Sequence, residues 1–265
     1  MIKIDINEVH QRLLEIAYFF HEICSRNDIP YYMLGGTMLG AYRHKGFIPW
    51  DDDMDFGVPL EHYERMKEVM GKELPSHFKC TTFRNDIGNR CSYVKIMDSS
   101  THIEDCTNRI PIENQLGVNI DVFPLVRCDK KSVAIKRLII MRRITRLVYY
   151  EPIDCGLIKK CINRFCKVLF PINQHKMLDL IQNKVHKCYN SKGKFIGNIL
   201  GAWGTKEIVD DSIMGKPTLY PFEGIKLYGV AQPELYLTEL YGSEYMTPPP
   251  KDKLHLHINN VYKKE

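Results

Sequence analysis

Residues 35–59 read GGTMLGAYRHKGFIPWDDDMDFGVP, and this stretch decides the fold. A glycine pair follows the strand-like residues 31–34 and precedes a predicted helical turn over residues 39–43. Glycine lets the backbone approach a ligand closely, and N–H groups at the start of a helix attract phosphate. Further on, acids alternate with apolar residues, which predicts a strand over residues 54–58.

Three aspartates are the candidate catalytic residues and metal ligands. Asp53 and Asp55 are two positions apart, so on a strand they point to the same face. Two such carboxylates repel each other unless a cation lies between them, and hard oxygen ligands suit Mg²⁺ or Mn²⁺. Asp121, in Ile120-Asp121-Val122, has the apolar flanks of a central strand, where an acid is costly unless it is paired or metal-bound. The alternative, a solvated acidic loop, is disfavoured by the order of the glycine pair and the acids.

The remaining pattern predicts an α/β fold. Apolar residues at three-and-four spacing indicate a helix over residues 9–23, capped by Asp5 and Glu8. A further helix is predicted over residues 61–70, and strands over 91–97 and 118–122, with Pro124 ending the latter. We expect residues 1–126 to form the catalytic core. Residues 127–265, basic, helical and then irregular, are expected to pack on this core or to continue it as one domain.

The order of the motifs, apolar-Gly-Gly, Asp-x-Asp and a later apolar-Asp-apolar, resembles the nucleotidyltransferase superfamily. Residues 35–59 more narrowly resemble the LicD family of phosphocholine transferases, which is similar to the fukutin-type ribitol-phosphate transferases. The segments YVKIMD (93–98) and GVNIDVFPL (117–125) support this resemblance. It extends over residues 7–125, with a weaker match in the PPPKDK ending and the nearby His255 and His257. The resemblance implies a nucleotidyltransferase-like mixed sheet with flanking helices.

The resemblance also implies an activity: transfer of phosphocholine from CDP-choline to a sugar hydroxyl of a cell-envelope glycan such as lipopolysaccharide, with release of CMP. Asp53, Asp55 and Asp121 would then hold Mg²⁺ or Mn²⁺ beside the diphosphate, and Asp121 would take the proton of the hydroxyl. Three alternatives stay open. They are a nucleotidyltransferase that uses a nucleoside triphosphate, a transferase of another alcohol phosphate (ethanolamine, glycerol or ribitol), and a catalytically inactive sugar- or lipid-binding module.

Other residues near the acids are candidate substrate contacts. The glycine-rich turn would present N–H groups to phosphate, and two basic side chains are candidate phosphate ligands, with a plain surface charge as the alternative. A tryptophan could line a choline pocket, because aromatic faces bind quaternary ammonium groups, or it could simply pack. These residues are Gly35, Gly36, Thr37, Arg43, Trp50 and Lys95.

Charge is unevenly distributed along the chain. The net charge is +5, yet residues 127–167 alone contain twelve Lys or Arg against three acids. The segment 136–146 alternates basic and bulky apolar residues at helical spacing, and its Arg142, Arg143 and Arg146 are expected to face an anionic membrane surface that carries the acceptor, or else solvent. Nucleic acid is not an expected partner, because interleaved aromatics and RNA-binding motifs are missing.

The expected location is the cytoplasm, at the inner face of the membrane. Residues 1–10 include Asp5 and Glu8 and lack the apolar stretch of a secretory signal. No run of eighteen apolar residues predicts a membrane span. The nine cysteines show no disulfide spacing, which is typical of a reducing compartment.

Overall fold

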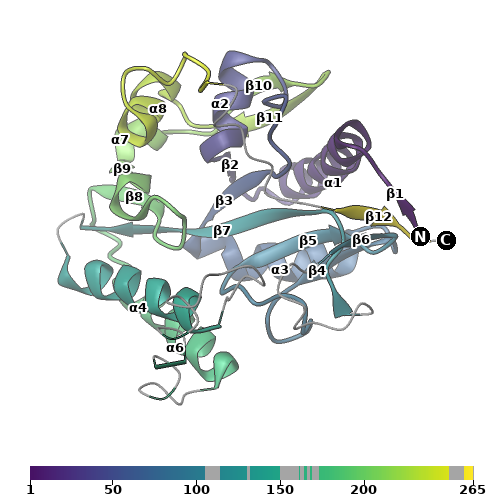
Figure 1. Cartoon of the computed structure of the whole chain (residues 1–265). Coiled ribbons are helices and arrows are strands. Elements are labelled where there is room, and N and C mark those ends of the chain that lie inside the picture. Colours follow the sequence, from purple (N-terminus) through teal and green to yellow (C-terminus); the bar gives the residue numbers. More distant parts are fainter. Residues whose placement is uncertain are drawn as a thin grey trace.

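The computed structural model describes residues 1–104, 114–129, 132–149, 161, 164–165, 168, 173–250 and 260–264. Within these residues the protein has an α/β fold around a mixed seven-stranded sheet, which confirms the predicted fold class (Figure 1). Five strands follow one another in the order β2-β3-β7-β5-β4, and β8 and β9 continue the sheet from β7. Their bounds are β2 (Tyr32–Met33), β3 (Asp55–Pro59), β4 (Phe78–Thr81), β5 (Val94–Asp98), β7 (Asn119–Cys128), β8 (Phe195–Asn198) and β9 (Ile208–Asp210).

The central strand is β7, which has partners along both edges. β3 runs parallel to it on one edge. The other edge pairs antiparallel with β5 over residues 119–122 and with β8 over residues 125–128. The prediction that Pro124 ends this strand is therefore wrong. Proline lacks an N–H for a ladder bond, but Pro124 lies where the partner changes from β5 to β8, so the strand continues through it.

Two amphipathic helices, α1 (Ile6–Arg26) and α3 (Leu60–Glu73), contact each other and the sheet (Figure 1). α1 buries the stripe of apolar residues that predicted it, and Asp5 caps its N-terminus by accepting a hydrogen bond from the Glu8 N–H at 2.9 Å. The apolar faces of both helices and the strands of the sheet share one hydrophobic core. The predicted first helix and its cap are confirmed.

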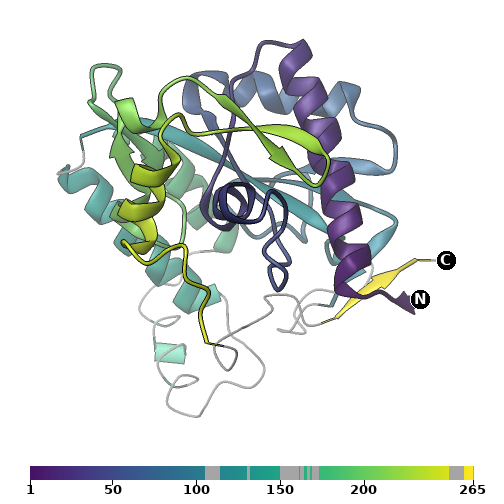
Figure 2. The ribbon, with the colours of Figure 1, turned by 90° about the horizontal axis from the view of Figure 1, so that it is seen from above.

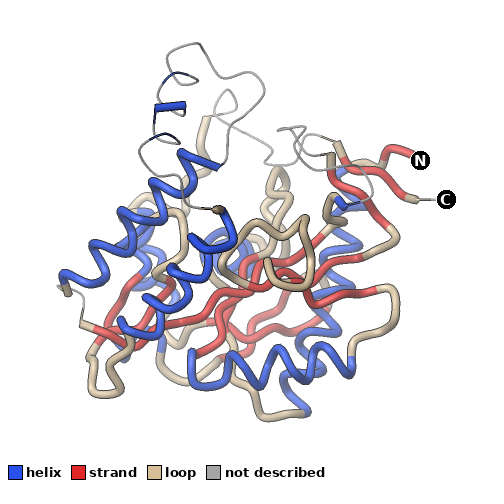
Figure 3. Tube along the Cα trace, turned by 90° about the horizontal axis from the view of Figure 1, so that it is seen from below, coloured by secondary structure: helices blue, strands red, loops and turns tan. Residues whose placement is uncertain are grey.

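A second pair of helices, α4 (Val133–Tyr149) and α6 (Gln174–Cys188), packs side by side next to β7 (Figure 3). α4 begins a few residues after β7 ends and buries Ile135, Leu138 and Ile139. Because β8 and β9 follow these helices and pair back onto β7, the C-terminal half of the chain completes the sheet begun by the N-terminal half.

A third group lies beside β2 and β3 and comes from both halves of the chain. It consists of α2 (Gly35–Arg43), the hairpin β10 (Thr218–Phe222) and β11 (Ile225–Gly229), and α8 (Pro233–Tyr241). Figure 2 shows α2 end-on between the hairpin and α8. α2 begins at Gly35 and not, as predicted, near residue 39, and its first residue has a φ of +50°, which glycine tolerates.

Five short elements complete the description. α7 (Asp211–Met214) follows β9, and the 3₁₀ turn η2 (Gly204–Glu207) precedes it. A small sheet of β1 (Ile2–Lys3), β12 (Val261–Lys263) and β6 (Thr101–Ile103) brings both ends of the chain together (Figure 1). None of the described helices has the length and apolar character needed to cross a bilayer.

Candidate active site

A row of three charged residues crosses the sheet. Asp55, the first residue of β3, is the register partner of Asp121 on β7, and Lys95 on β5 is the partner of Asp121 on its other side. Partnered residues of neighbouring strands point to the same face. The register therefore brings Asp55 and Asp121 side by side, as expected, and adds Lys95 to them.

Asp53 lies outside the strand that was predicted to carry it. β3 begins at Asp55, and the preceding run follows a turn in which the Asp51 N–H donates to the Ile48 carbonyl at 2.9 Å. His10 of α1 anchors residues 47–51: its Nε2 lies 2.6 Å from the Asp51 carbonyl oxygen, and its ring stacks on Phe47 with the centroids 4.0 Å apart. The acids of residues 51–53 thus belong to a fixed loop at the end of the sheet.

Several carboxylates converge on Asp55. Burial raises the pKa of Asp55 well above its usual value, and repulsion from Asp53, Asp121, Glu207 and Asp51 adds to the effect. Repulsion of this kind is relieved when a cation binds between the acids. The described residues also place carboxylate oxygens of residues 51, 52 and 53 within 4.8 Å of one another. These hard oxygen donors fit Mg²⁺ or Mn²⁺.

Lys95 forms a partly buried ion pair with Asp121; the two side chains are 15% and 17% exposed. The Lys95 ammonium also donates to Asn119 Oδ1 at 2.9 Å. Burial by itself would lower the pKa of Lys95, but the attraction of Asp121 outweighs it and raises the pKa above its usual value. Lys95 therefore stays charged and keeps a counter-charge beside Asp121, so its predicted phosphate contact would compete with this pair.

The glycine pair places the start of α2 against the acids. A Cβ on Gly35 would lie 3.5 Å from Asp55 Oδ2, and a Cβ on Gly36 would lie only 2.5 Å from Asp51 Oδ2. Thr37 connects α2 to β3, since its Oγ1 accepts a hydrogen bond from the Asp55 N–H at 2.8 Å. The N-terminus of a helix is thus fixed beside the carboxylates, which is an arrangement that binds phosphate groups.

The two other candidate contacts are Arg43 and Trp50. Arg43 ends α2, about 12 Å along the helix from Gly35, and its Nη1 donates to the Tyr245 carbonyl at 2.9 Å. Trp50 is partly buried and packs against the hydrophobic core. A phosphate role for Arg43 and a choline role for Trp50 remain predictions.

Four residues from the C-terminal half lie near these acids and were not predicted. Tyr236 of α8 accepts a hydrogen bond from the Gly35 N–H at 3.1 Å, and the Tyr241 hydroxyl lies 3.7 Å from the position of a Cβ on Gly35. Burial first, then Tyr236 and Asp55, raise the pKa of Tyr241 well above its usual value. The other two residues are Trp203 and Glu207.

Glu207 is a buried acid that organises the turn before β9. Its Oε1 accepts a hydrogen bond from the Trp203 N–H at 2.8 Å. Gly201 is required beside it, because a Cβ there would lie 1.9 and 2.0 Å from the two carboxylate oxygens. Burial raises the pKa of Glu207 to about 7, against the opposing effects of the Trp203 N–H and Arg142.

Arg142, expected to face a membrane surface or solvent, instead donates to the Leu200 carbonyl, because the turn before β9 packs on α4. The side chain of Arg146 lies outside the described residues.

One of these four residues had a usable sequence signal. Glu207 directly precedes the apolar pair Ile208-Val209, as Asp55 precedes Phe56, and an acid at the start of a strand is the pattern that identified Asp55. Tyr236 and Tyr241 of α8 could not be identified in the same way, because tyrosines at this spacing also occur in ordinary helices that pack on a core. His255 and His257 lie outside the described residues.

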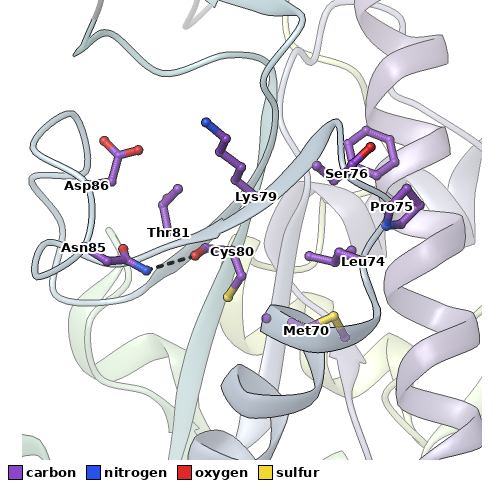
Figure 4. A pocket seen from close by; sticks show the side chains of 11 residues that line it. Met70, Leu74, Pro75, Ser76, Lys79, Cys80, Thr81, Asn85 and Asp86 are labelled. Atoms are coloured by element: carbon purple, nitrogen blue, oxygen red, sulfur yellow. Dashed lines mark hydrogen bonds between the residues drawn. The ribbon is translucent and has the colours of Figure 1, made fainter.

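A surface hollow of about 480 Å³ lies elsewhere, between the end of α3 and β4. Figure 4 shows its lining, which includes Met70, Leu74, Lys79 and Asn85, with the Asn85 amide donating to the Cys80 carbonyl at 3.2 Å. None of the predicted site residues lines it. Since the converging acids and the helix N-terminus are at the β3–β7 end of the sheet, we place the candidate site there.

The chain is similar to several known proteins. Residues 28–132 match a family model described as LicD/FKTN/FKRP, nucleotidyltransferase domain. The chain is 26% identical to the lipopolysaccharide cholinephosphotransferase LicD of Haemophilus influenzae, over 99% of each chain. It is also 36% identical over 64 residues to the human ribitol 5-phosphate transferase FKRP, which is 24% of this chain and 13% of that protein. The matched region contains the glycine pair, the acids and Lys95.

Proposed function

We propose that this protein transfers phosphocholine from CDP-choline to a sugar hydroxyl of lipopolysaccharide or a similar glycan and releases CMP, because residues 28–132 match the model of the LicD/FKTN/FKRP nucleotidyltransferase domain. The observation that carries the proposal is the row of Asp55, Asp121 and Lys95 beside the N-terminus of α2. The name of the full-length relative, a lipopolysaccharide cholinephosphotransferase, supports the transferred group and the acceptor.

The reaction requires an activated hydroxyl and a stabilised diphosphate. We assign Asp121 as the base: its carboxylate takes the hydroxyl proton while the sugar oxygen bonds to the phosphorus that carries choline, and the bond from that phosphorus to the CMP oxygen breaks. Lys95 places a positive charge beside this carboxylate through their ion pair. The first N–H groups of α2 orient the diphosphate, and Gly35 and Gly36 allow it to approach.

Asp53, Asp55 and Asp121 are the residues that would hold Mg²⁺ or Mn²⁺, because they are hard oxygen donors whose mutual repulsion a cation would relieve. Asp51, whose carboxylate lies close to that of Asp53, offers a further oxygen. A divalent cation at this site supplies neutralisation of the negative charge that develops on the departing CMP. In its absence the same acids repel a diphosphate, so we expect the reaction to require the metal.

The acceptor side is proposed to involve α4. Its outward residues combine exposed apolar side chains, Val133 (61% exposed) and Ile140 (56% exposed), with the exposed cations Lys136, Arg137 and Arg143. A helix face of this composition suits an anionic lipid surface, where a lipid-linked acceptor would be found. Peripheral contact with the cytoplasmic face of the membrane follows from this proposal.

The α4 proposal has a direct test in vesicle co-sedimentation at low salt. Arg137→Glu with Arg143→Glu should weaken binding to anionic vesicles, and the effect should fade above roughly 0.15 M salt, where the screening length is about 8 Å. The matched control reverses two exposed lysines of α6, Lys184→Glu and Lys187→Glu. Equal loss in both double variants would mean that only net charge matters.

The test of the activity is donor competition with purified protein, an oligosaccharide acceptor and Mg²⁺. CDP-choline should be consumed with equimolar CMP and phosphocholine-modified acceptor. Pyrophosphate from CTP or ATP would instead identify a nucleotidyltransferase that uses a triphosphate. Faster use of CDP-ribitol, CDP-glycerol or CDP-ethanolamine would reassign the transferred group, and binding of the acceptor without turnover of any donor would indicate an inactive binding module.

A further inference from the structure

The edge of the candidate site carries an aromatic corner. The Trp203 side chain is 49% exposed, although tryptophan occurs only twice in the chain and Trp50 packs against the core. The ring of Trp203 meets that of Tyr241 edge to face, with centroids 5.4 Å apart and planes at 83°. The two ring planes therefore stand at nearly a right angle, and about half of Trp203 is exposed to solvent.

This corner adjoins the acids. The hydroxyl of Tyr241 and Oδ2 of Asp55 flank the same glycine, at 3.7 and 3.5 Å from the position of a Cβ on Gly35. A group bound in the corner therefore lies next to the start of α2, where the diphosphate is proposed to bind. The carboxyl groups of Asp55, Asp51 and Glu207 all interact with Tyr241, and Arg43 is the one cation of this neighbourhood that the described residues place against it, so acidic groups outnumber basic ones here.

The corner already accommodates a positive charge. Lys206 places its ammonium over the Trp203 ring, 5.9 Å from the centroid. A quaternary ammonium binds to the same kind of surface but carries no N–H donors, so aromatic faces and a negative potential are its usual recognition elements. Lys206 is exposed and on a flexible side chain, which lets a ligand cation displace it.

The backbone on both sides of the corner is anchored. The backbone N–H of Trp203 donates to the buried carboxylate of Glu207 at 2.8 Å, and Tyr241 ends α8, whose Tyr236 and Leu237 lie in the core. A site that is fixed before the ligand arrives loses less entropy on binding.

We propose that Trp203 and Tyr241 form the subsite for the trimethylammonium group of the transferred phosphocholine and so set the preference for choline over ethanolamine. This inference rests on the proposed phosphocholine transfer and assigns the choline contact to the C-terminal half of the chain. Trp50 remains the rival candidate from the sequence.

The experiment compares kcat/KM for CDP-choline, CDP-ethanolamine and the neutral isostere CDP-3,3-dimethylbutanol in Trp203→Ala, Tyr241→Phe and Trp50→Ala. Trp203→Ala should lower kcat/KM for CDP-choline roughly tenfold relative to the isostere. Tyr241→Phe keeps the ring and should largely keep the preference. The matched control is Tyr18→Ala, since Tyr18 is 44% exposed and also sits in an edge-to-face pair, with Phe19 at 5.5 Å, on the distant helix α1.

The outcomes separate this inference from the proposed function. No turnover of CDP-choline by the unmodified protein would remove the proposed function itself. Turnover with equal losses for all three donors in Trp203→Ala would overturn only the subsite, as would a choline-selective loss confined to Trp50→Ala. A Trp203→Ala defect in KM for the acceptor alone would also overturn it, because the corner would then be a stacking surface for the sugar.

Discussion

Replacing Glu207 by Gln should change how the stability of the protein depends on pH. Burial raises the pKa of this carboxyl from 4.5 to about 7 in the folded protein. The folded state therefore binds the proton more tightly than the unfolded state, and the resulting stability is fully present below pH 4.5 and is lost as the pH rises through 7. At about 1.4 kcal/mol per pKa unit, the loss amounts to about 3 kcal/mol between pH 4 and pH 8.

Gln has nearly the same shape and can still accept the Trp203 N–H bond, but it does not titrate. The unmodified protein should therefore lose stability relative to Glu207→Gln by about 3 kcal/mol over this pH range. A constant offset between the two proteins is expected as well, because one of the carboxylate's remaining hydrogen bonds, from Asn198, is lost in the variant.

Urea unfolding at half-unit pH steps, with EDTA present in every sample, measures the difference directly. The expected result is a free-energy difference that grows between pH 4.5 and 7.5 and then levels off. Parallel stability curves for the two proteins would refute the reasoning, because they would mean that Glu207 titrates alike in the folded and unfolded states.

Three further changes test other parts of the site. Asp55→Asn should abolish transfer while leaving the circular dichroism spectrum and cooperative unfolding unchanged, because it removes a carboxylate from a crowded acidic cluster; normal turnover would exclude Asp55 from catalysis. Gly36→Ala should sharply reduce activity, since its Cβ would lie 2.5 Å from a carboxylate oxygen of Asp51. The control is Gly71→Ala on α3, where a Cβ meets nothing within 4 Å; it should keep activity and gain about 0.5–1 kcal/mol of stability. Equal activity of the two variants would contradict this expectation. Tyr236→Phe should lose about 1–3 kcal/mol in urea unfolding, because the N–H at the start of α2 loses its acceptor, and an unchanged midpoint would mean that water replaces the hydroxyl.

The sequence predicted the elements whose apolar pattern is strong and local. The helix capped by Asp5 and the strand beginning at Asp55 show the spacing of helix and strand in a short window, and both are present. Residues 54–58 and 118–122 also predicted neighbouring strands with an acid on each, which the parallel register of β3 and β7 confirms.

These local patterns do not predict which strands and helices pair when they are far apart in the sequence. Pro124 ordinarily marks the end of a strand, and only the change of partner from β5 to β8 explains why β7 continues. The contribution of Tyr241 depends on α8 packing against α2, which lies about 200 residues earlier in the chain, and that of Trp203 depends on η2 packing against α8. Lys95 was predicted as a phosphate ligand, but its pairing with Asp121 follows from the register of β5, which short-range periodicity does not determine.

The most direct test of the account is a single quantitative reaction. Purified protein is incubated with CDP-choline carrying labelled choline and with delipidated oligosaccharide, in Mg²⁺ or in EDTA. We expect one CMP released per labelled phosphocholine bound to the oligosaccharide in Mg²⁺, and neither product in EDTA or with Asp121→Asn. Labelled oligosaccharide formed at an undiminished rate in EDTA, or by Asp121→Asn, would contradict the assignment of the chemistry to this row of residues.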